Sequence, residues 1–177
     1  MTRRQLNLAG AAACAGMMGC ALFFQHGLGL EPCPLCVLQR VATISLGLVF
    51  LFAAVLNPAR LGSRIFGILT LIVAGLGASV SARQVWLQNL PPDQVPACGP
   101  GLDYMLEVFP LGDTLAMVFK GSGECAEVVW RFLGLSMPAW VLICLLSLGL
   151  IGLIGNWRLH GRLRGTSREQ SRTAPAG

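Results

Sequence analysis

Four cysteines of this 177-residue chain lie outside its apolar stretches, in two separate polar segments. Cys33 and Cys36 form a Cys-Pro-Leu-Cys motif directly before an apolar run, while Cys98 and Cys125 lie in one long polar segment. A Cys-x-x-Cys spacing brings two sulfurs close enough to form a disulfide that exchanges readily with other thiols. The pair Cys98 and Cys125 is, on its own, more often a structural staple. Two pairs in neighbouring segments shift the interpretation towards a thiol relay.

The residues around the motif favour a reactive thiolate at Cys36. Pro32 and Pro34 restrict the backbone before the apolar run, so Cys36 is predicted near a helix N-terminus, where free amide groups stabilise a thiolate. Arg40 follows one helical turn later, and its charge is expected to favour that thiolate further. A cation at this depth suits an electron acceptor that lives in lipid and becomes anionic on reduction, such as a quinone. The alternative for Arg40 is ordinary snorkelling to the membrane surface.

Composition indicates that the elements holding these residues cross a membrane. The chain is 54% hydrophobic and 12% charged, with a mean hydropathy of +0.66. A soluble core could not bury this much apolar surface. We predict an all-α integral membrane protein, a single domain over residues 1–177 built as a four-transmembrane-helix bundle. A helix crosses about 30 Å of hydrocarbon with about 20 residues, and the predicted spans are about 8–24, 36–56, 65–87 and 137–155.

The distribution of charge predicts how the bundle is oriented. Arginines gather before the first predicted helix, between the second and third, and after the fourth. Short loops rich in Lys and Arg stay in the cytoplasm. Of the eight acidic residues, all but Glu169 lie in the opposite loops. Both termini are therefore predicted to be cytoplasmic and both cysteine pairs to face outward, and the net charge of +5 gives no reason to infer a nucleic-acid partner.

The two outward loops are predicted to differ in size. The first, about 25–35, holds little besides the Cys-x-x-Cys motif, and the second, about 88–136, is long and rich in proline. Apolar and acidic residues mix between 102 and 119, which predicts short interfacial helices on the bilayer, with a loosely packed cap as the alternative. The first apolar run is interpreted as an uncleaved signal-anchor. The arginine-rich tail, about 160–177, is predicted to be disordered.

Small residues inside the apolar runs are expected to serve packing. Cys14, Cys20 and Cys144 are interpreted as packing side chains without disulfide partners. Six glycines are expected at close helix contacts, namely Gly10, Gly16, Gly19, Gly67, Gly75 and Gly77. A zinc site made from the four outward cysteines is formally possible. No metal is expected, because an oxidising compartment would compete for the thiols.

The chain resembles the bacterial disulfide bond formation protein B (DsbB) family, quinone-linked thiol oxidases of the inner membrane. The resemblance covers nearly the whole chain up to the tail. Its motifs are Pro-Cys-Pro-Leu-Cys-Val-Leu-Gln-Arg at 32–40, Arg-Gln-Val-Trp-Leu-Gln at 83–88, Pro-Ala-Cys-Gly-Pro at 96–100 and Gly-Ser-Gly-Glu-Cys-Ala-Glu at 121–127. The resemblance places the outward loops in the periplasm of a bacterial inner (cytoplasmic) membrane.

The resemblance also implies a route for electrons. The partner would be a thioredoxin-fold protein of the periplasm, similar to DsbA, which oxidises other proteins and is thereby reduced. Its reduced form would attack a Cys98–Cys125 disulfide at Cys98 and form a mixed disulfide. Electrons would pass to Cys33 and Cys36, with a Cys33–Cys125 disulfide as an intermediate. Cys36 would then form a charge-transfer or covalent adduct with ubiquinone or menaquinone beside Arg40.

Gln84 departs from some members of the family, which place a His near the end of the third helix. An amide can hydrogen-bond a quinone carbonyl, but it cannot relay a proton as imidazole does. The sequence therefore predicts a quinone-dependent protein-disulfide oxidoreductase, with Arg40 and Gln84 at the quinone and four cysteines carrying electrons. The alternative from another class is a non-catalytic membrane scaffold whose outer loops are stapled by disulfides.

Overall fold

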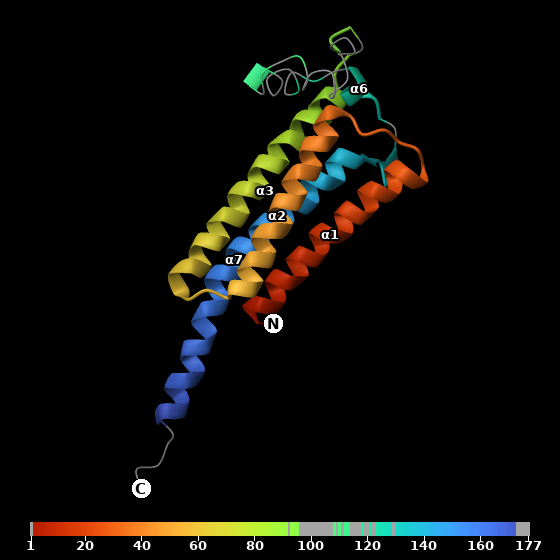
Figure 1. Cartoon of the computed structure of the whole chain (residues 1–177). Helices are drawn as coiled ribbons and strands as arrows, with labels where there is room; N and C mark the ends of the chain where they lie inside the picture. The colour runs from red at the N-terminus through yellow and green to blue at the C-terminus, as the bar shows by residue number, and fades with distance from the viewer. Residues whose placement is uncertain are drawn as a thin grey trace.

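The structure is a computed structural model of the chain, in which four long helices form one bundle (Figure 1). The described residues are 2–91, 93–95, 108, 110, 112–113, 118, 121, 123–128 and 130–172, with side chains as far as residue 157. Cys98 and most of the predicted interfacial segment, 102–119, lie outside the described residues.

The four helices are α1 (Arg3–Gly27), α2 (Pro34–Leu56), α3 (Arg60–Gln88) and α7 (Met137–Arg172). Each contains an apolar segment long enough to cross a membrane, which in α7 is Met137–Trp157. Helix α3 packs against α2 and α7, and α1 packs against the same two helices. The predicted all-α membrane bundle is confirmed.

Local sequence signals set the ends of the first two helices. Thr2 and Gln5 form a capping box at the start of α1, each side chain bonded to the other residue's backbone N–H. Helix α2 begins with Cys33 as its N-cap and Pro34 in its first turn, where a missing N–H costs nothing. It ends at Asn57, whose φ of 37° is the left-handed conformation of a helix C-cap. The Cys-x-x-Cys motif is therefore the rigid beginning of a helix.

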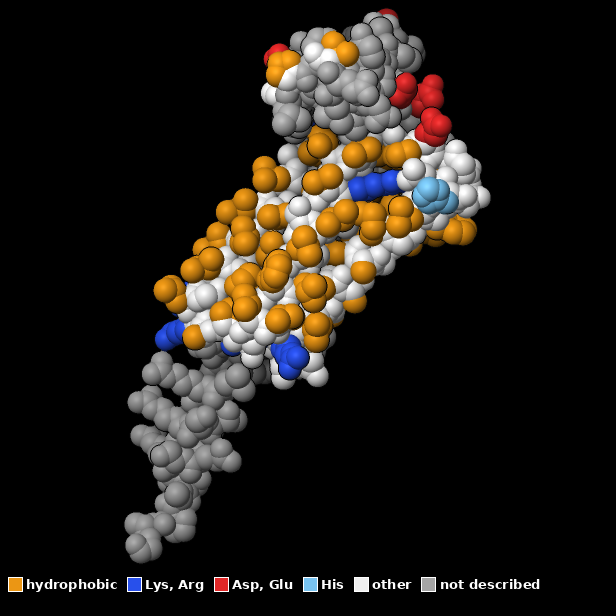
Figure 2. Space-filling model, in the orientation of Figure 1, with side chains coloured by type: hydrophobic (Ala, Val, Ile, Leu, Met, Phe, Trp, Pro, Cys, Tyr) orange, Lys and Arg blue, Asp and Glu red, His pale blue; other side chains and the backbone are white. Residues whose placement is uncertain are grey.

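The surface of the bundle suits a lipid environment. Figure 2 shows hydrophobic side chains along its length, acidic side chains near the end that carries α6, and several Lys or Arg side chains at the opposite end. Large side chains such as Phe52, Val55 and Leu76 are exposed on helix surface that no described element covers. Apolar patches of this extent are found on proteins that bury them in a membrane or in another protein. The chain is a multi-pass membrane protein.

Small residues let α3 and α7 approach closely. A Cβ added at Gly149 of α7 would lie 2.7 Å from the Cβ of Ala74 on α3. A Cβ at Gly77 would lie 2.8 Å from Ala42 and 2.9 Å from Leu145. Membrane helices lack a hydrophobic driving force between them, so such close backbone contacts contribute much of their association.

The predicted packing glycines are confirmed only in part. Gly10, Gly67 and Gly77 face neighbouring helices closely enough that an added Cβ would be crowded. The prediction is wrong for three others, because no described atom of another helix lies within 4 Å of a Cβ placed at Gly16, Gly19 or Gly75. Glycine content reveals that a helix has small residues, but the face that meets a neighbour is decided by tertiary packing. Cys14 packs in the core as predicted, whereas Cys20 is exposed.

Gly149→Ala is expected to lower the melting temperature, because overpacking a fitted contact costs about 1–3 kcal/mol. Gly75→Ala is the matched control beside Ala74, since its Cβ would enter open space and Ala favours a helix over Gly by about 1 kcal/mol. Thermal unfolding of both purified variants in detergent measures the difference. Equal melting temperatures would contradict a close approach of α3 and α7 at this point.

A buried polar contact joins the far ends of α1 and α7. The side chains of Asn7 and Asn156 each donate a hydrogen bond to the other at 3.2 Å. The hydroxyl of Ser63 on α3 donates to the backbone carbonyl oxygen of Asn156 at 2.7 Å. Unpaired amides would be costly in an apolar interior, so their pairing favours one rotational setting of these helices. No feature of the sequence had predicted this contact.

Short elements cover the other end of the bundle. Helix α6 (Gly123–Ala126) carries Cys125, and strands β1 (Arg131–Phe132) and β2 (Leu135–Ser136) form an antiparallel hairpin that leads into α7. This hairpin was not predicted. The tail also differs from its prediction, because α7 continues as a helix to Arg172, where disorder was expected from about residue 160. Its backbone hydrogen bonds are made within the helix, so a polar sequence can extend it beyond the apolar span.

Candidate active site

The first turn of α2 places the two sulfurs of the Cys-x-x-Cys motif together. The backbone N–H of Cys36 donates to the Sγ of Cys33 at 3.3 Å. Cys36 lies in the first turn of the helix, as predicted, but the amide group at this N-terminus is directed at Cys33. The stabilisation of negative charge by the helix N-terminus is therefore directed at the sulfur of Cys33, because the side chain of an N-cap residue accepts hydrogen bonds from these amides.

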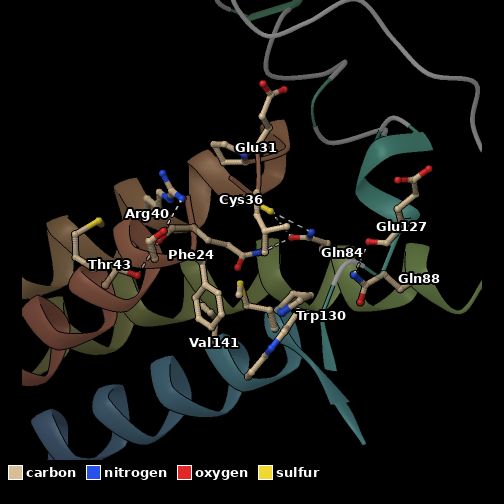
Figure 3. Close-up of a pocket in the computed structure, with 17 residues that line it drawn as sticks. Phe24, Glu31, Cys36, Arg40, Thr43, Gln84, Gln88, Glu127, Trp130 and Val141 are labelled. Carbon is tan, nitrogen blue, oxygen red and sulfur yellow. Dashed lines mark hydrogen bonds between the residues drawn. The ribbon is translucent and has the colours of Figure 1, made fainter. Parts of the chain in front are cut away.

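Gln84 reaches this pair of sulfurs from α3. Its side chain is only 3% exposed, and its Nε2 donates to the Sγ of Cys33 and to the Sγ of Cys36, both at 3.3 Å. The other end of the same amide, Oε1, accepts a short hydrogen bond of 2.6 Å from Nε2 of Gln39 and a long one of 3.8 Å from the Sγ of Cys36. Figure 3 shows the Gln84 side chain directed at Cys36. The structure thus joins Gln84 to the cysteines, a contact that was not predicted.

Cys125 joins the same cluster from α6. It is fully buried with Cys33, Leu35 and Leu87, and Cys36 packs against this group. Gly121 permits the approach of the loop, because its φ of 85° is open to glycine and an added Cβ would lie 2.4 Å from Leu87. Three of the four predicted relay cysteines therefore meet, and Cys98 lies outside the described residues.

The cluster changes the ionisation of its central thiol. Hydrogen bonds with Cys125 and then with Cys36, together with burial, raise the pKa of Cys33 well above its ordinary value. Burial in an apolar cluster disfavours a charged sulfur, and a neighbouring thiolate disfavours a second one. Cys33 therefore stays a neutral thiol while the cluster is reduced.

Arg40 lies one turn below Cys36 and is held by α1. One guanidinium nitrogen donates to Oε1 of Gln25 and the other donates to the carbonyl oxygen of Ala21 at 3.2 Å. Among the described residues, these are the partners of its side chain. The hydrogen bonds of Cys36 run to Cys33 and Gln84 instead, so Arg40 is oriented by helix α1 rather than by the thiol.

A pocket of about 130 Å³ opens beside Cys36. Arg40, Gln84 and Gln88 contribute its polar wall, and Phe24 and Trp130 contribute to its apolar wall (Figure 3). A cavity of about 150 Å³ can hold one benzene ring, so the volume suits a single six-membered ring. Apolar walls with a few convergent polar groups are typical of sites for small organic ligands.

The polar groups of the pocket fit a quinone. Arg40 has donors beyond the two that bond α1, and a carbonyl oxygen of a quinone accepts such donors. Oε1 of Gln88 is buried and has no hydrogen-bond partner among the described residues, which leaves an acceptor for the hydroxyl group of a reduced ring. The donor set therefore suits both the oxidised and the reduced form.

Aromatic side chains form part of the pocket wall. The rings of Phe24 and Trp130 lie 5.1 Å apart, and Trp130 stacks on Phe132 of β1 at 5.7 Å. Trp140 of α7 donates its ring N–H to the Phe132 carbonyl at 3.1 Å. These contacts with the hairpin hold Trp130 on the pocket wall. Each aromatic pair stabilises the arrangement by about 0.5–1.5 kcal/mol beyond the effect of the area it buries.

Sequence reasoning missed three polar residues of this site. Gln39 and Gln88 were quoted within motifs but given no role, and Gln25 was given none. The available signal was a polar amide within or beside an apolar helix, because such groups inside membranes face partners or function. In the part of the chain that the structure describes, no group of three or more His, Cys, Asp or Glu side chains suits a metal ion.

Comparison with known proteins identifies the family. The family model "Disulfide bond formation protein DsbB" matches residues 3–155. "Disulfide bond formation protein B" of Methylococcus capsulatus is 55% identical over 154 residues, covering 87% of this chain and 94% of the relative. The protein of the same description from Nitrosococcus oceani is 53% identical over 152 residues, covering 86% and 88%. The chain belongs to the DsbB family of disulfide bond formation proteins, and is a multi-pass membrane disulfide oxidoreductase.

Proposed function

We propose that this protein oxidises the dithiol of a periplasmic thioredoxin-fold oxidant, similar to DsbA, and passes the electrons to a membrane quinone, ubiquinone or menaquinone. One observation carries the proposal. The thiols of Cys33, Cys36 and Cys125 lie in one buried cluster, and Cys36 also lines a ring-sized pocket beside Arg40. A sulfur cluster that touches a ligand pocket can connect thiol exchange to an acceptor in the membrane.

The thiol half of the reaction begins at a Cys98–Cys125 disulfide, the pairing that the family resemblance implies. One thiolate of the partner attacks Cys98, and Cys125 leaves as a thiolate. The second thiol of the partner then breaks the mixed disulfide, so the partner departs as a disulfide and Cys98 is left as a thiolate. The partner has lost two electrons and two protons.

The packing of Cys125 against Cys33 supports the next step. The Cys125 thiolate attacks Cys33 of the Cys33–Cys36 disulfide, and Cys36 leaves as a thiolate. The Cys98 thiolate then attacks Cys125, which restores the Cys98–Cys125 disulfide and releases Cys33. The two electrons now reside on Cys33 and Cys36, next to the pocket.

The pocket residues act on the acceptor and on Cys36. A quinone bound there supplies an acceptor for two electrons and two protons. Arg40 would hold one carbonyl oxygen, and Gln88 would accept a hydrogen bond from the reduced ring. Gln84 lines the pocket, but both its contacts through Nε2 are to sulfur, so we assign it to the thiols rather than to the quinone carbonyl.

The proposed orientation places α6 in the periplasm and the N-terminus in the cytoplasm of a bacterial inner membrane. The N-terminus, the connection between α2 and α3, and the extension of α7 lie at one end of the bundle (Figure 1). The chain at that end is rich in arginine, which favours the cytoplasmic side. The cysteine cluster then faces an oxidising compartment, where disulfides persist.

The test is quinone reduction by purified protein in detergent, with a reduced thioredoxin-fold periplasmic oxidant as donor. Turnover by the parent and none by Cys33→Ser is the expected result, because Cys33 connects Cys125 to Cys36. No turnover by intact protein with bound quinone would favour the alternative of a membrane scaffold stapled by disulfides. Such a scaffold would also keep its disulfides in mild thiol, whereas a relay exchanges them.

A further inference from the structure

We infer that Gln39 is a positioning residue of this relay, which acts by fixing the orientation of the Gln84 side-chain amide against the sulfurs of Cys33 and Cys36. The inference rests on the proposed function and deepens it. Gln39 touches neither sulfur through any described hydrogen bond. Its side chain lies one turn after Cys36 and meets Gln84 across the interface between α2 and α3.

The amide of Gln84 has two chemically different ends. Its NH₂ group donates hydrogen bonds and stabilises a thiolate, whereas its carbonyl oxygen would repel a thiolate. Rotation by 180° about the last side-chain bond exchanges these ends with little change in shape. One orientation of the amide therefore stabilises the reduced, charged form of the cysteine pair, and the other orientation destabilises it. The group that bonds the far end of the amide selects the orientation.

Gln39 occupies that other end. Its Nε2 donates to Oε1 of Gln84 at 2.6 Å, which leaves both N–H groups of Gln84 for Cys33 and Cys36 at 3.3 Å each. The side chains of Gln39 and Gln84 are only 6% and 3% exposed, so water does not compete for these bonds. In a low dielectric such bonds are strengthened, and an unpaired amide would be costly.

The consequence is a bias in the thiol–disulfide equilibrium of the Cys33–Cys36 pair. A neutral disulfide is a poor acceptor, and Cys33 stays a neutral thiol in the reduced pair. The bond from Gln84 to the sulfur of Cys36 is therefore the one that stabilises the reduced pair more than the oxidised pair. A disulfide becomes a stronger oxidant when its reduced form is stabilised. By holding the NH₂ group towards sulfur, Gln39 makes this pair a better acceptor of electrons from Cys125.

Two substitutions at Gln39 distinguish its effect on the orientation of the Gln84 amide from its effect on the packing of α2 against α3. Gln39→Met retains length but cannot hydrogen-bond, so the Gln84 amide is free to take either orientation. Gln39→Glu retains the shape of glutamine but presents only acceptors when ionised, so it should draw the NH₂ group of Gln84 away from the sulfurs. The order of oxidising strength is expected to be parent, then Gln39→Met, then Gln39→Glu.

The measurement is the equilibrium of the Cys33–Cys36 pair with a reference dithiol, read by differential alkylation of these two residues in the full-length membrane protein. Cys98→Ser and Cys125→Ser are present throughout, so that this pair titrates alone within the relay. Gln39→Met should shift the equilibrium about fivefold towards the disulfide, and Gln39→Glu about tenfold or more at an alkaline pH where the introduced carboxyl is ionised, as expected for one hydrogen bond to a neutral or charged partner. At low pH, protonation of the carboxylate introduced by Gln39→Glu should restore a donor and reduce the shift that this variant causes.

A double-mutant cycle tests whether Gln39 acts through Gln84. In a Gln84→Met background, Gln39→Met should leave the equilibrium unchanged, because no amide remains to be oriented. Thr70→Val is the matched control, since it removes a buried hydroxyl from α3 at a distance from the sulfurs and should not shift the equilibrium. Thermal unfolding of each variant checks that the bundle is intact.

The inference is overturned if both Gln39 variants keep the parent equilibrium, or if Gln39→Met shifts it equally when Gln84 is replaced by Met. Neither quinone nor a partner protein takes part in this measurement. A failure of the proposed function would therefore appear as absent turnover with the predicted equilibrium shifts preserved. A failure of the positioning role would appear as normal turnover without those shifts.

Discussion

Cys36→Ser is expected to reduce turnover to background and, when combined with Cys98→Ser, to leave Cys33 joined to Cys125 in a disulfide. Cys36 is the sulfur that lines the pocket, so its loss removes the connection to the acceptor. Cys33 and Cys125 remain in contact within the buried cluster, and the double variant lacks both thiols that could break a bond between them. The oxidised form of the periplasmic partner supplies the oxidant and is reduced as the two sulfurs are joined, and peptide mapping under non-reducing conditions detects the trapped disulfide.

Cys20→Ser is the control for this experiment, because Cys20 is exposed on α1 and takes no part in the cluster. It should retain parental turnover and accumulate no Cys33–Cys125 disulfide. Turnover by Cys36→Ser would contradict the order of electron transfer from Cys125 through Cys33 to Cys36. In the double variant, a disulfide between Cys125 and a cysteine other than Cys33 would contradict it as well. The result does not depend on which quinone the membrane contains.

Arg40→Met is expected to raise the apparent KM for quinone by about tenfold or more, since a hydrogen bond from a charged donor contributes about 1.5–3 kcal/mol. The guanidinium is already oriented by Gln25 and Ala21, so it can meet a carbonyl oxygen without first being ordered. Arg40→Lys should recover part of the loss, because it keeps the charge but lacks the planar fork. Steady-state rates over a range of quinone concentrations measure the effect.

The dithiol half of the reaction should survive Arg40→Met. A single oxidation of the reduced partner needs only the cysteine disulfides, and Arg40 makes no described hydrogen bond to them. Arg64→Met is a suitable control, because Arg64 lies over the ring of Trp157 at the other end of the bundle. An unchanged quinone KM in Arg40→Met would leave membrane anchoring as the role of this residue.

Helix positions were predictable because they depend on contiguous sequence. The cost of exposing apolar residues and free backbone groups makes a long uncharged stretch a spanning helix wherever its neighbours lie. The structure extends the first three predicted spans by a few residues, for example from 8–24 to Arg3–Gly27, and the fourth as far as Arg172, since polar residues continue a helix beyond the hydrocarbon. Capping signals such as Thr2 with Gln5 mark such ends.

Contacts between helices were less predictable. Gly75 and Gly77 are two residues apart on α3, yet only Gly77 meets a neighbouring helix. Likewise, Gln84 was predicted to lie at a quinone, which stays a prediction, whereas its hydrogen bonds to two sulfurs and to Gln39 were not predicted. Each outcome depends on how far one helix is rotated relative to the next, which is set by the packing of all residues along the interface.

The sequence by itself determined that four apolar helices cross a membrane and that a Cys-x-x-Cys motif opens one of them, with Arg40 one turn later. These are local properties, fixed by hydropathy, proline and helical spacing. Only the tertiary structure decided that Cys125 lies against Cys33, that Trp130 lines a pocket beside Cys36, and that Gln39 orients an amide 45 residues away. Such contacts join segments distant in the chain, and the packing of the whole bundle selects one arrangement among many that the same local pattern allows.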